Sequence, residues 1–298
     1  MNEAFKRQVS LVLDTLPEVA KEECFALHGG TAINLFVRDM PRLSVDIDLT
    51  YVPIANRESS ISDSIKSLTE IENRLKKIKP GIITSLQKQK LKLQIAHMGA
   101  QIKVEVNQIN RGCISDPKNR MLCNKAQEMF DAFCEIKTVP NSQLFGGKII
   151  AALDRQHPRD MFDIKHLLEK DGIDDEIKPG FILCLLSSNR PVYELLNPQM
   201  KDQRQAFENQ FAGMHDEPFS YEDFEKTRDE LITEVKELLN NEDKAIILNF
   251  KNLTPDWDVY DFKDFPAIKW KLKNLERFRE SNEDGYNKAQ ERLASYLK

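Results

Sequence analysis

Two carboxylates spaced one residue apart are the side chains of this sequence best suited to metal-assisted chemistry. Asp46 and Asp48 lie within residues 43–51, where apolar and polar residues alternate. This period of two predicts a β-strand with one buried face, and it places both acids on the other face. Two carboxylates held side by side repel each other, and a divalent cation with oxygen ligands is the usual reason to hold them there. The pair therefore predicts a site for Mg²⁺ or Mn²⁺.

A glycine turn precedes this acidic strand. A short apolar run over residues 25–27 meets Gly29 and Gly30, and a helix-like stretch begins near Thr31. Glycine accepts positive φ, and backbone N–H groups at the start of a helix can face an anion. The glycine pair alone is more typical of a tight turn, and the acid pair alone is more typical of a solvated strand face. Their order in the chain favours a site for a triphosphate that carries a metal ion.

A third carboxylate lies on a predicted hairpin further along the chain. Apolar and polar residues alternate over residues 91–95 and again over residues 102–106, and Met98-Gly99-Ala100 supplies a turn between them. This pattern predicts two antiparallel strands. Glu105 lies on the polar face of the second strand, beside Lys103. It can be a third metal ligand or simply the solvent side of a half-exposed strand.

Two blocks of the sequence resemble a known family. Gly29-Gly30-Thr31 with the string from Arg42 to Leu49 is similar to the nucleotidyltransferase toxins of the AbiEii/AbiGii group, which includes the MenT toxins of type IV toxin–antitoxin and abortive-infection systems. Residues 148–163 resemble the family's lysine-bearing helix and its Arg-Asp-x-x-Asp motif. Residues 265–275 also resemble the family, so the likeness extends over most of the chain.

The resemblance implies roles for individual residues. Asp46, Asp48 and Glu105 are the expected metal ligands and, with Lys148 and Asp163, the expected catalytic residues. The expected nucleotide-binding residues are Gly29, Gly30, Thr31, Arg42, Ser44, Lys148 and Asp160. Simpler alternatives stay open for the second block. Lys148 can be a surface lysine of an amphipathic helix, Asp160 can stabilise a helix N-terminus, and the acids can pair with bases that hold two helices together.

The expected architecture is α+β. A polymerase-β-like nucleotidyltransferase domain, a small mixed twisted sheet with helices, is predicted over residues 1–135, and a helical domain completing the nucleotide cleft over residues 136–298. Helical periodicity predicts helices near residues 4–22 and 61–75 in the first part. In the second part it predicts helices ending near Arg155 and Lys170.

Composition narrows the classes of protein. The formal charge of −5 gives no overall sign of nucleic-acid binding, so RNA would have to contact local basic patches. The candidates are Lys88, Lys90 and Lys92, and Arg111, Lys118, Arg120 and Lys125. The five scattered cysteines suggest neither a disulfide framework nor a zinc site. No apolar run approaches the roughly 18 residues that span a bilayer, which predicts a cytoplasmic protein without a membrane partner.

The resemblance also implies a function. It predicts a metal-dependent toxin that transfers a nucleoside monophosphate from a nucleoside triphosphate to an RNA acceptor such as the 3′ end of tRNA. A cognate antitoxin encoded nearby is the expected partner. Two alternatives stay open at this stage, namely transfer of AMP to a protein hydroxyl and a non-catalytic GTP- or NTP-binding module in phage defence.

Overall fold

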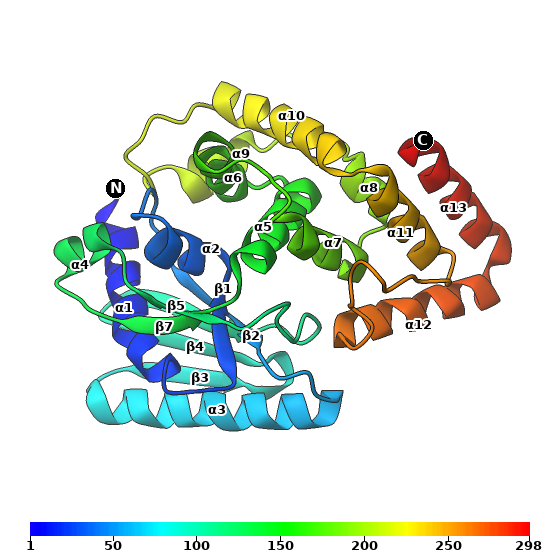
Figure 1. Cartoon of the computed structure of the whole chain (residues 1–298). Coiled ribbons are helices and arrows are strands. Elements are labelled where there is room, and N and C mark those ends of the chain that lie inside the picture. Colours follow the sequence, from blue (N-terminus) through cyan, green and yellow to red (C-terminus); the bar gives the residue numbers. More distant parts are fainter. The chain divides into compact units, whose positions relative to one another are not determined.

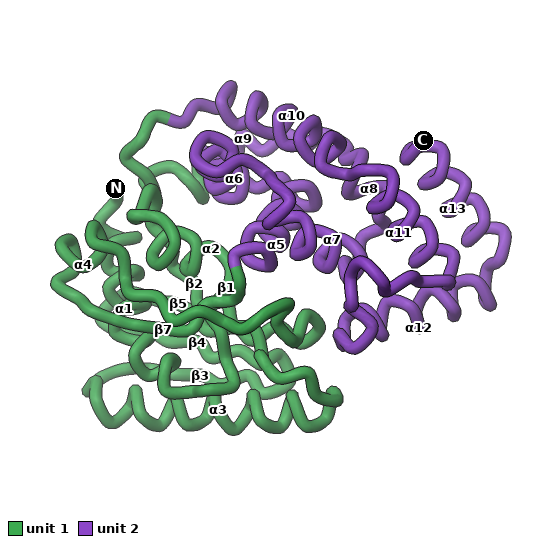
Figure 2. Tube along the Cα trace, in the orientation of Figure 1, with its two compact units in different colours: residues 1–140, 209–218 green, residues 141–208, 219–298 purple.

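The chain folds into two compact units, which Figure 2 shows in different colours. The computed structural model describes residues 1–298. Unit 1 comprises residues 1–140 and 209–218, and unit 2 comprises residues 141–208 and 219–298. A single boundary after residue 135 does not describe this division, because unit 1 extends to Pro140 and includes a later segment of the chain.

The later segment, residues 209–218, belongs to unit 1 through backbone contacts. The amide of Leu43 donates a hydrogen bond to the carbonyl of Met214 at 2.7 Å, and the amide of Asn2 donates to Gly213 at 2.8 Å. Arg42 forms an isolated antiparallel bridge with His215. Such pairing joins residues far apart in the sequence, so local periodicity could not predict it.

A mixed seven-stranded sheet forms the centre of unit 1, with the strand order β3-β4-β5-β2-β1-β7-β6. The strands are β1 (Phe25–His28), β2 (Asp46–Tyr51), β3 (Ile83–Gln87), β4 (Lys92–His97), β5 (Ala100–Val106), β6 (Lys118–Met121) and β7 (Glu135–Thr138). The β2–β5 and β1–β7 pairs are parallel, and the other pairs are antiparallel. The predicted hairpin is confirmed as β4 and β5, with Met98 and Gly99 at its turn.

Helices cover one face of this sheet. The helical segments of unit 1 are α1 (Glu3–Val19), α2 (Gly29–Ala32), the π-helical turn η1 (Ile33–Val37), α3 (Arg57–Ile78), the 3₁₀ turn η2 (Lys88–Lys90) and α4 (Asn124–Phe130). Helices α1 and α3 contact each other and the β3–β5 part of the sheet (Figure 1). Ile47 of β2 and Val104 of β5 are fully buried, so the residues that alternate with them lie on the opposite face.

Unit 2 is helical. Its helices are α5 (Asn141–Arg155), α6 (Pro158–Lys170), α7 (Lys178–Ser187), α8 (Val192–Leu196), α9 (Arg204–Ala206), α10 (Tyr221–Leu238), α11 (Asn241–Lys251), α12 (Pro266–Ser281) and α13 (Glu283–Leu297). The π-helical turn η3 (Phe207–Phe211) lies where the chain passes into residues 209–218. No helix of the structure combines the length and apolar character that crossing a membrane requires.

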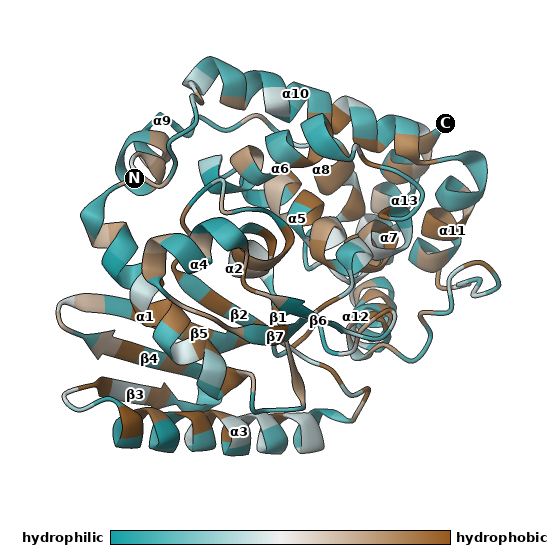
Figure 3. Ribbon diagram, turned by 60° about the vertical axis from the view of Figure 1, so that its left-hand side comes forward, coloured by the Kyte–Doolittle hydropathy of each residue, from teal (hydrophilic) through white to brown (hydrophobic).

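Hydropathy explains the arrangement within unit 2. Helix α7 is apolar around most of its circumference and almost completely buried, as a central helix must be. Helix α10 has one buried side, and most of its ribbon is coloured as hydrophilic in Figure 3. Its N-terminus carries a capping box in which Ser220 and Asp223 satisfy each other's backbone N–H groups.

Two glycines allow α5 and α7 to pack closely. A Cβ atom added to Gly180 of α7 would lie 2.0 Å from the carbonyl oxygen of Ser142 on α5. A Cβ atom added to Gly146 of α5 would lie 2.4 Å from the backbone of Gly180. Both contacts are with backbone, which cannot move aside without separating the helices.

We expect Gly180→Ala to destabilise the protein. The added methyl group must push α5 and α7 apart, and overpacking of this kind costs about 1–3 kcal/mol or more. Urea denaturation measures the loss. Ala289→Ser is the matched control, because it enlarges a small side chain at an exposed position of α13. Equal stability of Gly180→Ala and the wild type would show that the two helices do not cross as closely as described.

Candidate functional site

The two aspartates of β2 lie on the face of the sheet opposite α1 and α3. Asp46 and Asp48 are half-buried and alternate with Ile47 and Leu49, which are fully buried. The predicted shared face of the two acids is therefore confirmed. The strand begins at Asp46 and not at residue 43, because the preceding residues pair instead with residues 214 and 215.

The glycine turn lies directly against this acid pair. His28, the last residue of β1, is the registered partner of Asp48, and Gly29 follows with φ of +72°. A Cβ atom at Gly29 would lie 2.7 Å from Oδ2 of Asp48, and one at Gly30 would lie 2.9 Å from a guanidinium nitrogen of Arg42. The left-handed φ and the close approach both require glycine at position 29. The backbone is thereby brought next to a carboxylate.

Thr31, Arg42 and Ser44 support this turn from inside the protein. Each is buried, and the hydroxyl of Thr31 lies 3.0 Å from that of Ser44 and also donates to the carbonyl of Asp46. The guanidinium of Arg42 donates to the carbonyl of Leu43 at 2.9 Å. These contacts fix the backbone of the turn relative to β2. The three side chains are thus placed beside the acids, with part of their hydrogen-bonding capacity used by the protein itself.

Glu105 lies beside Asp48, and a lysine lies among the acids. The parallel pairing of β2 with β5 places Glu105 opposite Asp48 and Lys103 opposite Asp46. The ammonium of Lys103 is 2.5 Å from Glu105 and 3.9 Å from Asp46, and Lys92 of β4 is 3.2 Å from Glu105. Burial by itself would raise the pKa of Glu105, but the two lysines outweigh burial and hold this pKa below its ordinary value.

The strand carboxylates, Asp46, Asp48 and Glu105, have the chemistry of a magnesium site but are not gathered into one. No group of three or more acidic, histidine or cysteine side chains is arranged so that it could hold a metal ion. The ammonium of Lys103 already occupies a cation's place between Asp46 and Glu105. Mg²⁺ is commonly bound by one or two carboxylates plus substrate phosphates, so Asp46 and Asp48 fit such an ion as a pair.

The second predicted block forms a buried cluster within unit 2. Lys148 of α5 lies 2.8 Å from Asp160 and 2.9 Å from Asp163, both on α6, and all three side chains are at most 5% exposed. Arg155, at the end of α5, donates two hydrogen bonds to Asp160, at 2.6 and 3.0 Å. We call these four residues the Lys148 cluster. It shows that Lys148 is not a surface lysine and that both acids contact it.

The cluster is close to electrical balance, with two acids facing two bases. Burial by itself would raise the pKa of Asp160, but Lys148 and Arg155 outweigh burial and hold it well below its usual range. Buried charges are tolerated only when they are paired and hydrogen-bonded in this way. In this structure the ammonium of Lys148 is therefore used to hold α5 and α6 together.

The sequence pattern identifies Lys103 only as a neighbour of Glu105 and Arg155 only as the end of a helix, so it misses that both bases pair with the acids. Strand alternation could have revealed Lys103, because the residue two positions before Glu105 shares its face. Arg111, predicted for a basic patch, is buried and donates to the carbonyl of Asn56 at 3.2 Å.

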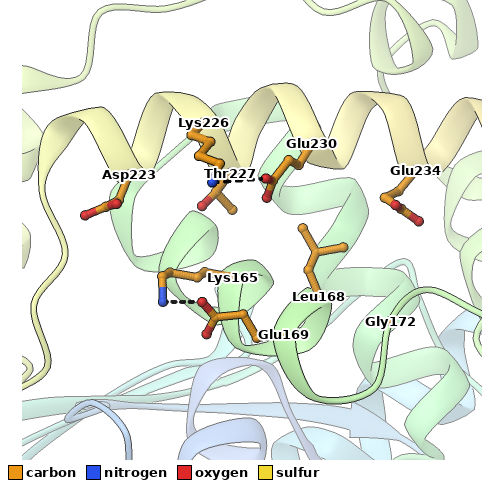
Figure 4. Close-up of a pocket in the computed structure, with 9 residues that line it drawn as sticks. All are labelled: Lys165, Leu168, Glu169, Gly172, Asp223, Lys226, Thr227, Glu230 and Glu234. Carbon is orange, nitrogen blue, oxygen red and sulfur yellow. Dashed lines mark ion pairs between the residues drawn. The ribbon is translucent and has the colours of Figure 1, made fainter.

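A surface pocket lies elsewhere in unit 2. It has a volume of about 460 Å³ and lies between α6 and α10 (Figure 4). Ion pairs along its wall join Lys165 to Glu169 at 2.6 Å and Lys226 to Glu230 at 3.7 Å. None of the predicted site residues lines this pocket, so its volume does not identify the site.

We expect Asp160→Asn to destabilise the protein by about 3 kcal/mol at pH 7, because it leaves the ammonium of Lys148 buried with one carboxylate fewer. A carboxyl whose folded pKa is lowered contributes stability above its ordinary pKa of about 4, and that stability is lost as the pH falls through the folded pKa. The free energies of unfolding of the wild type and of Asp160→Asn should therefore become more similar below about pH 4. Urea denaturation at several pH values measures them.

Asp154→Asn is the control for this experiment. Asp154 lies on the same helix as Lys148 but is partly exposed and pairs with Arg190 on the surface. Its replacement should change stability by no more than about 1 kcal/mol. A gap between wild type and Asp160→Asn that stays constant from pH 7 to pH 3 would contradict the lowered pKa.

Comparison with known proteins places the chain in a family. Residues 11–274 match the family described as "Nucleotidyl transferase AbiEii toxin, Type IV TA system". The fold is similar to that of MenT4, a nucleotidyltransferase toxin from Mycobacterium tuberculosis H37Rv, with a TM-score of 0.62 and 11% identity over 92% of this chain and 95% of that one. No curated protein matches the sequence. The chain belongs to the AbiEii family of nucleotidyltransferase toxins of type IV toxin–antitoxin systems.

Proposed function

We propose that this nucleotidyltransferase toxin moves a nucleoside monophosphate from a nucleoside triphosphate to an RNA hydroxyl, such as the 3′ end of tRNA, with Mg²⁺ as its cofactor. The observation that carries the proposal is the pair Asp46 and Asp48, held on one face of β2 with the backbone of Gly29 against Asp48. Family membership supports the transferase reaction and a cognate antitoxin. The metal is inferred from the chemistry of the site, and the RNA acceptor from the resemblance to the MenT toxins.

The proposed reaction is a substitution at the α-phosphorus. The acceptor hydroxyl loses its proton to solvent, its oxygen forms a bond to this phosphorus, the bond from the phosphorus to the bridging oxygen of the β-phosphate breaks, and pyrophosphate leaves. Magnesium, when bound, supplies positive charge to the phosphate and to the attacking hydroxyl. Asp46 and Asp48 would hold this ion, and the carboxylate of Glu105 would supply a third oxygen ligand.

Other residues bind and orient the nucleotide. The backbone at Gly30 and Thr31 faces the phosphates, and Arg42 and Ser44 hold this backbone in place. The resemblance to the family implies that Lys148 contacts the triphosphate, where an ammonium would stabilise the negative charge that develops on pyrophosphate. Asp160 and Asp163 orient Lys148, because both contact its ammonium at 2.8 and 2.9 Å.

We expect labelled nucleotide to appear on RNA when the protein is incubated with total tRNA, Mg²⁺ and each labelled nucleoside triphosphate in turn. Asp48→Asn removes the negative charge of a proposed metal ligand with little change in shape. It should lower the incorporation of labelled nucleotide by about 100-fold or more. Lys148→Met should also lower it strongly. Gel separation of RNA and protein identifies the acceptor.

Asp116→Asn and Lys170→Ala are the matched controls, because both side chains are exposed and lie outside the candidate site. Each should retain full incorporation, and thermal unfolding should show that the site variants are folded. Label on protein and not on RNA would replace the RNA acceptor with a protein hydroxyl. Label nowhere, with nucleotide still bound, would contradict the proposed transfer to RNA.

A further inference from the structure

The ammonium of Lys103 contacts two of the strand carboxylates. Lys103 lies on β5 with Glu105, and parallel pairing places it opposite Asp46 of β2. Its ammonium lies 2.5 Å from Oε2 of Glu105 and 3.9 Å from Oδ2 of Asp46. In this structure Lys103 therefore supplies the positive charge that neighbouring carboxylates require.

Two ion pairs, one to each strand, hold the charged form of Lys103 in this place. The second lysine, Lys92 of β4, contacts only the other oxygen of Glu105, at 3.2 Å. Of these two lysines, only Lys103 contacts acids of both β2 and β5.

An ammonium in this place must compete with a divalent cation. Both need the same oxygens of Asp46 and Glu105, and two cations held within about 4 Å of each other repel strongly even near a protein surface. A metal ion can therefore bind Asp46, Asp48 and Glu105 together only if the Lys103 ammonium leaves. Its side chain is 35% exposed, so its flexible stem can swing toward solvent without disturbing the core.

A nucleoside triphosphate provides a new partner for the displaced ammonium. A triphosphate carries several negative charges, so an ammonium that leaves Glu105 can pair with a phosphate oxygen beside the same face of the sheet. Metal binding then becomes favourable mainly when the nucleotide is present. Without nucleotide, Lys103 keeps Asp46 and Glu105 neutralised.

We propose that Lys103 is an internal competitor of the catalytic divalent cation and couples metal binding to nucleotide binding. Lys103 is thus a positioning residue, which acts through Asp46 and Glu105 and withholds them from the metal until the triphosphate arrives. This inference rests on the proposed function, because it requires that Asp46 and Asp48 hold a divalent cation.

Mn²⁺ binding to the full-length protein tests the proposal without measuring activity. Loss of the electron paramagnetic resonance signal of free Mn²⁺ gives the dissociation constant, with and without a non-hydrolysable nucleoside triphosphate. Lys103→Met removes the charge and keeps most of the side chain. In the absence of nucleotide it should tighten Mn²⁺ binding about tenfold or more, and the nucleotide should strengthen binding much less than in the wild type.

The control variants separate this inference from the proposed function. Lys90→Met removes an exposed lysine of η2 and should bind Mn²⁺ as the wild type does. Lys103→Arg keeps the charge and should not tighten binding. Unchanged or weaker binding by Lys103→Met, while Asp48→Asn abolishes binding, would overturn the role of Lys103 and leave the metal site intact. Binding that Asp48→Asn does not alter would overturn the metal site itself, and the inference with it.

Discussion

The placement of Asp46 and Asp48 on one face of β2 is the constraint on which the candidate site depends. Fully buried Ile47 and Leu49 fix which face of β2 points to the core, so the two acids cannot turn away from each other. Pairing of β2 with β5 and with β1 brings a third acid and a glycine turn to the same place. The sheet therefore holds negative charge together, and a cation must balance it.

Lysine balances carboxylates both on the sheet of unit 1 and in the Lys148 cluster of unit 2. In unit 1 the balancing charge comes from Lys103 and Lys92, and in unit 2 Lys148 is itself balanced by Asp160 and Asp163. Glu105, Asp160 and Asp163 are thus each paired with a lysine of the protein itself. Under the proposed function, substrate and metal would have to replace contacts that already exist.

The parts of this site that sequence could predict are those encoded locally. Strict alternation predicted β2 and the β4–β5 hairpin, and the order of glycine turn and acidic strand predicted that they would meet. The parallel register of β2 with β5 is set by long-range packing. The sequence pattern therefore could not predict that Lys103 lies opposite Asp46. The short edge strand β6 was also missed, because three of its four residues are exposed and no apolar alternation marks it.

A crystal structure with Mn²⁺ and a non-hydrolysable nucleoside triphosphate would test the central claim most directly. The anomalous signal of manganese locates the ion independently of any assumption about its ligands. We predict a peak at coordination distance from Asp46 and Asp48, with the ammonium of Lys103 withdrawn from Glu105. A peak remote from both aspartates, with Lys103 still paired to Glu105, would contradict the assignment of this strand as the site of nucleotidyl transfer.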